Sequence, residues 1–207
     1  MFFNGIDHLV VQPVFRNISN SFTYEFWVKP KVPHKIVEEA TDGVSGHTGQ
    51  KYVIGPGHTG TEECSGVGVS VGTNGVSVFE HSSNYLPALL VYSAPLEDWT
   101  HVAIVYKDKT PFLYINGELK KQGLTSRKKD VYASGLLGGY DPYGFYIGHL
   151  KYINIWDYSR SGDEIKREMY QILTNQKRGL FKAWWFHENI TVSPHSLFKQ
   201  VGIASIL

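Results

Sequence analysis

Residues 99–119 read WTHVAIVYKDKTPFLYINGEL. Aromatic and β-branched residues fill Trp99–Tyr106 and Phe112–Ile115, and such runs predict two neighbouring antiparallel strands. The second strand is expected to fold back at Asn116-Gly117, because a type I′ turn needs positive φ at both central residues and these two tolerate it best. A strand pair closed by a tight hairpin indicates an all-β sandwich. Sandwiches of this kind often serve as platforms that bind a ligand.

The composition fits one domain with a full core. The chain has 207 residues, of which 42% are apolar and 14% aromatic, and a β-sandwich of this length is commonly one domain. We therefore expect a single domain over residues 1–207. Its 20 basic and 19 acidic residues leave a net charge of +1, which creates no overall field to attract nucleic acid or an anionic membrane. A neutral partner is favoured.

The single cysteine, Cys64, excludes an internal disulfide, so stability has to come from burial. No apolar run reaches the roughly 20 residues that a membrane-spanning helix needs, so no membrane span is expected. The first residues lack the basic and apolar regions of a signal peptide. We expect either a protein that stays inside the cell or a module of a longer chain.

Strand signals recur along the chain between Gly, Asn, Asp and Pro residues, and one segment predicts a helix. The predicted strands are 7–12, 22–29, 50–54, 66–71, 76–81, 88–92, 99–106, 112–115, 118–121, 144–156 and 180–186. Ser161 and Glu164 can form a capping box, and Ile165, Met169 and Ile172 then share one face. This pattern predicts two antiparallel sheets with one short peripheral helix near 161–173.

The segment Thr73-Asn74-Gly75-Val76 predicts a second hairpin, whose two-residue loop would pair Val71 with Val78. Alternation then gives one face to Val67, Val69, Val71, Val76 and Val78, which predicts the core face. Phe79 and His81 fall on the other face, beside Ser70 and Gly68. Rings beside such small residues predict a shallow shelf that suits a sugar, the alternative being that another segment covers the rings.

Several segments resemble motifs of the laminin-G-like, concanavalin A-like jelly-roll domains. Residues 21–30, SFTYEFWVKP, resemble one strand of the family, and residues 99–117 resemble its pair of adjacent strands. Residues 3–7, 146–156 and 179–186 are similar to further family strands. These matches span nearly the whole chain.

The resemblance implies a jelly roll in which the matching motifs are scaffold. Function is then expected in the segments that do not match, chiefly Thr41–Asn84 and Lys128–Tyr143. Family members mostly bind glycans or proteins, often as accessory modules of glycan-processing enzymes, and many hold calcium at the sandwich rim. Here Lys151-Tyr152 stands where the family commonly has Asp-Glu, so the sequence does not support calcium, and no cofactor is expected.

The sequence gives little support to a metal site or to a catalytic site. His47, His58 and His81 lie in the long variable segment, but their spacing matches no metal-ligand motif. Glu25 and Glu80 are strand carboxylates that could face each other as the acid and nucleophile of a glycosidase. Glu80, however, shares the parity of the core valines and is expected at a strand end near solvent.

The remaining chemistry suits sugars, whose apolar faces stack on rings while their hydroxyls pair with polar groups. Residues 80–85 and 138–143 join rings to short polar groups beside flexible Gly or Ser. The predicted ligand-binding residues are Phe79, His81, Asn84, Tyr85, Tyr140, Asp141 and Tyr143.

We therefore expect a non-catalytic, lectin-like carbohydrate-binding module that is accessory to a glycan-processing enzyme such as a glycosyltransferase or glycosidase. Its partner would be an oligosaccharide or polysaccharide. The alternative is a protein–protein interaction or assembly domain that uses a sandwich face, and the third hypothesis is a glycoside hydrolase. A secreted module would be extracellular or at the cell surface, and one attached to a glycosyltransferase would be cytoplasmic.

Overall fold

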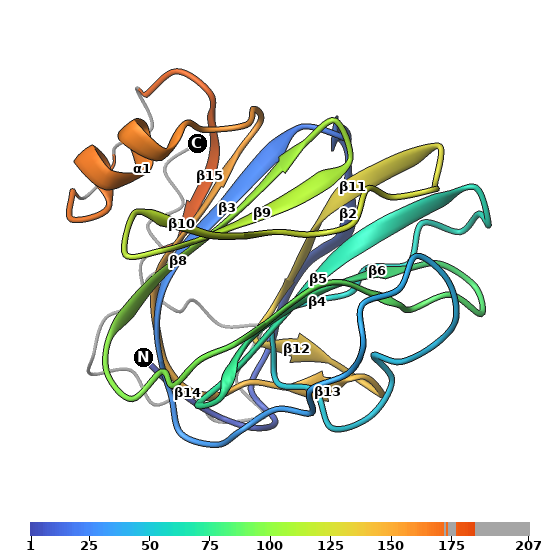
Figure 1. The fold of residues 1–207 in the computed structure, drawn as a ribbon, viewed down its shortest axis with the longest axis horizontal. Helices are drawn as coiled ribbons and strands as arrows, with labels where there is room; N and C mark the ends of the chain where they lie inside the picture. Colours follow the sequence, from blue (N-terminus) through green and yellow to red (C-terminus); the bar gives the residue numbers. More distant parts are fainter. Residues whose placement is uncertain (172, 174–176, 185–207) are drawn as a thin grey trace.

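The computed structural model is a sandwich of two β-sheets, which confirms the predicted fold class (Figure 1). It describes residues 1–171, 173 and 177–184. The first sheet has the strand order β1 (Phe2–Asn4), β14 (Ile147–Trp156), β3 (Phe22–Pro30), β8 (Thr100–Lys107), β9 (Thr110–Ile115) and β10 (Glu118–Gln122), and β15 (Leu180–Trp184) also pairs with β14. No helix among the described residues is long and apolar enough to span a membrane.

The second sheet has the order β2 (Leu9–Ser19), β11 (Asp130–Leu137), β4 (Tyr52–Gly55), β5 (Cys64–Gly72), β6 (Gly75–His81) and β7 (Ala88–Ser93). A two-stranded ribbon of β12 (Gly139–Tyr140) and β13 (Gly144–Phe145) contacts β4. The pairings between the described strands are antiparallel except for a short parallel one between β11 and β5. The sequence did not predict β11, because its small residues, DVYASGLL, interrupt the apolar alternation that marks a strand.

The core lies between the sheets, because alternate residues of each strand point inward. Four side chains of β3 are fully buried there, namely Phe22, Tyr24, Phe26 and Val28. The five valines of β5 and β6 belong to the same core cluster, which confirms the face that the sequence assigned to them.

The predicted hairpin at Asn116-Gly117 is confirmed. Both residues have positive φ, 51° and 77°, as a type I′ turn requires. Ile115 pairs with Glu118 across the turn.

The predicted register of the β5–β6 hairpin is wrong by two residues, since Val71 pairs with Val76 rather than with Val78. The turn is therefore centred on Thr73-Asn74. The side chain of Asn74 accepts a hydrogen bond from the backbone N–H of His34 at 3.0 Å and donates one to the His34 carbonyl at 2.9 Å. This long-range bridge fixes the turn, and an even shift leaves every side chain on its predicted face.

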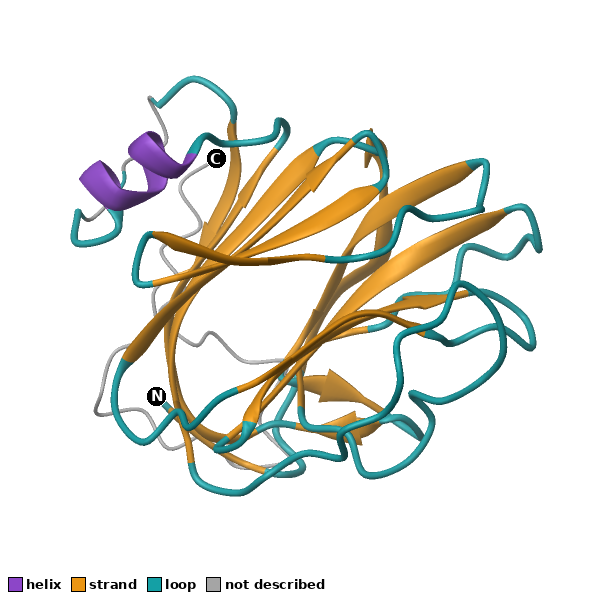
Figure 2. Ribbon diagram, in the orientation of Figure 1, coloured by secondary structure: helices purple, strands orange, loops and turns teal. Residues whose placement is uncertain are grey.

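The predicted shelf is also wrong, because the loops on either side of β4, residues 32–50 and 56–60, cover the outer face of the second sheet (Figure 2). Phe79 is fully buried in a cluster with Tyr52 and Leu86. A Cβ added to Gly66 would clash with the carbonyl oxygen of Gly57. The small residues beside the rings thus admit the covering backbone and leave no open space for a ligand.

The helix α1 (Gly162–Glu168) begins at the predicted capping box, in which Ser161 and Glu164 each accept a hydrogen bond from the other's backbone N–H. Ile165 is buried against β8. The helix is shorter than the predicted 161–173: Met169 is its C-cap, and Ile172 lies outside the described residues.

Candidate ligand-binding site

The seven residues predicted to bind a ligand do not form one surface. Phe79 is fully buried, and Tyr85 is 6% exposed with the Lys128 ammonium 3.9 Å from its ring centroid. Neither ring therefore has a free face on which a sugar could stack. Asn84, Tyr140 and Asp141 are exposed, and ligand binding by these three residues stays a prediction.

His81, at the end of β6, contacts residues from two other segments. Its Nε2 lies 3.1 Å from the hydroxyl of Tyr143, and its ring centroid lies 5.1 Å from that of His58. Burial, and next the neighbouring His58, lower the pKa of His81 to about 4. His58 uses both ring nitrogens, toward the Ser83 hydroxyl and the Gly60 N–H. The two rings therefore connect neighbouring loops of the structure.

The described residues do not fit a calcium or zinc site. Among them, no three His, Cys, Asp or Glu side chains gather in an arrangement that could hold a metal ion. Lys151, which stands where the family commonly has an acid, places its ammonium 4.2 Å from the ring centroid of Trp99. A cation in this position would repel a bound metal ion.

The two strand carboxylates lie on opposite sides of the first sheet. Glu25 is on the outer side, where it forms an ion pair with Arg160. Glu80 is fully buried between the sheets, so the prediction that it lies near solvent is wrong. Its burial is tolerated because its carboxylate accepts hydrogen bonds from Ser65, Tyr106 and Ser126.

A pocket on the outer face of the first sheet gathers several aromatic side chains. Its volume is about 380 Å³, and it is lined by Trp27, Trp99, Lys151, Tyr152, Met169, Tyr170 and Gln171. We call it the aromatic pocket. Tyr170 is 75% exposed, whereas Trp27 and Trp99 are half-buried. Rings that are anchored on one side and open on the other can stack against a ligand.

Three adjacent strands form the floor of this pocket. Their register places Trp27 of β3 between Lys151 of β14 and His101 of β8. The Trp27 ring centroid lies 5.4 Å from those of both His101 and Tyr170, and its Nε1 donates to the Met169 carbonyl at 2.8 Å. Trp27 thus ties the sheet to the segment after α1 and has a fixed orientation.

A β-bulge in β14 directs Tyr152 to the same pocket. The register between β14 and β3 shifts between Lys151 and Asn154, and Tyr152 has a φ of 56°. The Lys151 ammonium lies 5.8 Å from the Tyr152 ring centroid as well as over Trp99. Consecutive side chains therefore line one pocket, which a regular strand would not allow.

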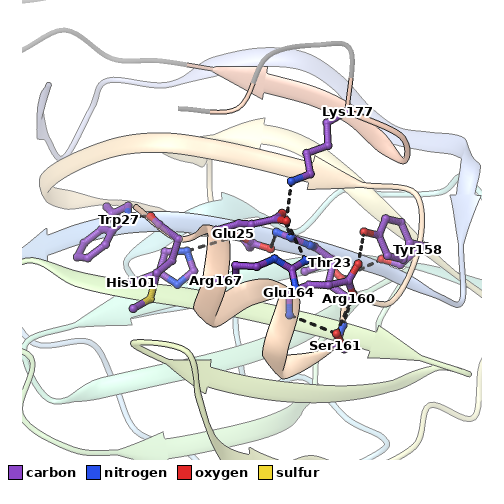
Figure 3. Close-up of polar contacts among 12 residues, drawn as sticks. Thr23, Glu25, Trp27, His101, Tyr158, Arg160, Ser161, Glu164, Arg167 and Lys177 are labelled. Atoms are coloured by element: carbon purple, nitrogen blue, oxygen red, sulfur yellow. Dashed lines mark hydrogen bonds and ion pairs between the residues drawn. The ribbon is translucent and has the colours of Figure 1, made fainter. Parts of the chain in front are cut away.

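A buried ion network docks α1 on the first sheet (Figure 3). Residues 169–171, which follow the helix, line the aromatic pocket. Arg160 pairs with Glu25 of β3 and Glu168 of α1, and all three side chains are at most 4% exposed. Glu168 also pairs with Lys177 at 2.6 Å and Arg167 at 3.0 Å. Burial acts to raise the pKa of Glu168, but hydrogen bonds from Lys177 and Arg167 hold this pKa below its ordinary value. The ion pairs of Arg160 with Glu25 and Glu168 thus fix the helix to the sheet.

The sequence did not predict the aromatic pocket. Trp27 and Trp99 lie in segments that resemble the family scaffold, and the resemblance therefore implies a structural role for both. The available signal was Lys151-Tyr152, a cation and a ring where the family commonly has two acids. Tyr170 carried no signal, because its place beside Trp27 depends on how α1 docks.

The chain belongs to the concanavalin A-like lectin/glucanases superfamily. The laminin G family model of that superfamily matches residues 4–166, which include β1 to β14 except for the first residues of β1. No curated protein sequence matches the chain.

Three solved structures are similar to this chain. A candidate carbohydrate-binding protein of Bacteroides ovatus is 15% identical, with 92% of this chain and 52% of that chain covered and a TM-score of 0.57. The ligand-binding domain of botulinum neurotoxin serotype D, solved with N-acetylneuraminic acid, is 16% identical, with 80% and 40% covered and a TM-score of 0.50. Domain 4 of an extracellular arabinanase from Geobacillus stearothermophilus, solved with arabinotriose, is 18% identical, with 80% and 74% covered and a TM-score of 0.46.

The chain spans about half of the length of the Bacteroides protein, 52%. For the Bacteroides protein and the botulinum neurotoxin domain, a likeness at these identities shows the fold alone.

Proposed function

We propose that this chain is a non-catalytic carbohydrate-binding module and that the aromatic pocket is its sugar site. The observation that carries the proposal is the exposed ring of Tyr170 beside the half-buried rings of Trp27 and Trp99 in one pocket. The apolar face of a sugar stacks on such rings, while its hydroxyls need polar partners. Lys151 and Gln171 supply donors in the same pocket.

The surroundings of the two strand carboxylates support a non-catalytic role. A glycosidase needs two carboxyl groups that flank the scissile bond. Glu25 is 2% exposed and engaged by Arg160, and Glu80 is fully buried in the core. Neither group is therefore free to act as acid or nucleophile.

An accessory role beside a glycan-processing enzyme, such as a glycosyltransferase or a glycosidase, is part of the proposal. The family match and the description of the Bacteroides neighbour as a carbohydrate-binding protein support the sugar-binding part of the proposal. A shallow site that exchanges water for protein hydrogen bonds gains little net free energy, so dissociation constants of about micromolar to millimolar are expected.

A glycan array followed by calorimetric titration tests the proposal. Tyr170→Ala should weaken binding of the best oligosaccharide about tenfold, because a stacking ring is lost. Ile36→Ala, an exposed apolar residue outside the pocket, is the matched control and should leave binding unchanged. Tyr140→Ala tests the exposed residues that the sequence predicted, Asn84, Tyr140 and Asp141. Loss of binding in this variant alone would place the sugar site at these residues instead of at the aromatic pocket. An array without any bound oligosaccharide would contradict the proposed function.

The second candidate function is assembly through a sheet edge. Within the described part of the chain, β2 lies at the edge of the second sheet, and its Val10 and Val11 are 46% and 39% exposed. An unpaired edge with apolar side chains can add a strand from another chain. Light scattering on a size-exclusion column would support assembly if it found an oligomer that Val10→Lys dissociates.

A further inference from the structure

The side chains that line the aromatic pocket carry a net positive charge. Among the described residues that line it, Lys151 is the single charged one. No carboxylate faces it across the pocket, whose other lining residues are aromatic, thioether and amide side chains. The pocket therefore presents a positive charge to any ligand.

Three acidic residues around the pocket already have cationic partners. Asp98, next to Trp99, pairs with Lys29 at 2.8 Å. Glu25 and Glu168, in the ion network that docks α1, are both engaged by Arg160. None of these three carboxylates is left to neutralise Lys151.

The ammonium of Lys151 is also held in place. It lies 4.2 Å from the ring centroid of Trp99 and 5.8 Å from that of Tyr152, so two ring faces attract it. Rings accept no conventional hydrogen bond, and the donors of the ammonium stay available to a ligand. A cation positioned before binding loses less conformational entropy when the ligand arrives.

We propose that the aromatic pocket selects a sugar that carries a carboxylate, such as a uronic acid residue. The carboxylate pairs with Lys151 while the apolar face of the same sugar or its neighbour stacks on Tyr170 and Trp27. This inference rests on the proposed function and narrows its class of ligand to acidic sugars. The overall charge of the chain predicts a neutral partner, whereas the local charge of the pocket favours an acidic one.

The test compares two matched pairs of oligosaccharides by calorimetric titration at low salt. The pairs are tetragalacturonate with its methyl ester, and tetraglucuronate with cellotetraose. In each pair the ring is retained and the charge is removed. The acidic member of at least one pair should bind about fivefold more tightly than its neutral partner, and the ratio should shrink as salt is added.

Variants assign the preference to one residue. Lys151→Gln should bring the two members of the pair to similar affinities, and Lys151→Arg should restore the preference. Lys107→Gln, an exposed lysine at the end of β8, is the matched control and should keep the ratio of the wild type. A heparin-derived tetrasaccharide that binds more tightly than either uronate would overturn the choice of a carboxylate and indicate a sulfate.

The outcomes separate this inference from the proposed function. Equal binding of both members of each pair, or tighter binding of the neutral members, overturns the inference and leaves the carbohydrate-binding function standing. A preference that persists in Lys151→Gln overturns the role of Lys151. Failure of every acidic and neutral glycan to bind overturns both.

Discussion

Tyr152 is held in a backbone conformation that few tyrosines adopt. Its φ of 56° lies in the left-handed region, which costs a residue with a Cβ about 1–2 kcal/mol. The pairing of β14 with β3 along its length, and with β15 beyond the bulge, holds this conformation. Strained residues of this kind concentrate at binding sites, and the ring of Tyr152 lines the aromatic pocket.

Tyr152→Gly should therefore separate stability from binding. The free energy of unfolding should rise by about 0.5 kcal/mol, because relief of the strained φ exceeds the added flexibility of glycine in the unfolded chain. Sugar binding should weaken about tenfold, because one ring of the pocket is lost. Urea unfolding and calorimetric titration measure the two effects.

The matched control for this variant is Asp108→Gly, in the turn between β8 and β9, where φ is 48°. It relieves a similar conformation outside the pocket, so binding should stay at the wild-type value. If Tyr152→Gly lost stability and binding together, Tyr152 would be a structural residue rather than one that the fold strains for its ligand.

At the scale of elements, α1 is attached to the first sheet by charge more than by apolar burial. Its fully buried apolar contact is Ile165, whereas Arg160 joins Glu25 of β3 to Glu168 of the helix. Arg160 also stacks on Trp156, with its guanidinium carbon 3.9 Å from the ring centroid. Removal of the one buried cation would leave two buried carboxylates with less compensation.

Arg160→Met should lower the free energy of unfolding by about 3–5 kcal/mol, the usual cost of breaking a buried ion pair. It should also weaken sugar binding. Met169 and Tyr170 line the pocket and come directly after α1, so their positions depend on how the helix is docked. Thermal unfolding and titration measure these effects. Lys166→Met, on an exposed position of the same helix, is the control and should change neither. Binding that survived in a folded Arg160→Met protein would contradict the coupling of α1 to the pocket.

The elements that the sequence predicted well are those that local chemistry specifies. The Asn116-Gly117 turn and the Ser161–Glu164 capping box involve residues at most three positions apart, and both are confirmed. The predicted register of β5 and β6 was wrong because a contact between Asn74 and His34, 40 positions away in the sequence, decides where the turn lies. The aromatic pocket was missed for the same reason, since its rings come from separate parts of the chain that only tertiary packing brings together.

At the scale of the whole molecule, Glu80 links the two sheets through the core. Its carboxylate accepts hydrogen bonds from Tyr106 of β8 in the first sheet and Ser65 of β5 in the second. Burial raises the pKa of Glu80 from 4.5 to about 7, although hydrogen bonds from Ser126, Ser65 and Tyr106 act to lower it. The folded state therefore favours the protonated acid more than the unfolded state does.

Because the pKa of Glu80 is higher in the folded state, the stability of the fold depends on pH. Below a pH of about 4.5 Glu80 is protonated in both states, so no penalty for ionisation arises. As the pH rises toward about 7, the unfolded chain ionises first, and the folded protein loses stability relative to it. Above the pKa of the folded state the loss is complete and constant. Burial lowers the pKa of His34 to about 4, so protonation of that ring destabilises the fold at acidic pH and opposes this trend in the wild type.

Glu80→Gln isolates the contribution of this one group, because the histidines titrate alike in the variant and the wild type. The difference in unfolding free energy, variant minus wild type, should rise by about 3 kcal/mol between pH 4.5 and 7 and then level off. Urea unfolding at a series of pH values measures it. Glu118→Gln is the control: a hydrogen bond from Lys120 lowers the pKa of Glu118, so its difference should not rise over this window. A flat difference for Glu80→Gln would mean that Glu80 ionises in the core as readily as in water, which would contradict its raised pKa.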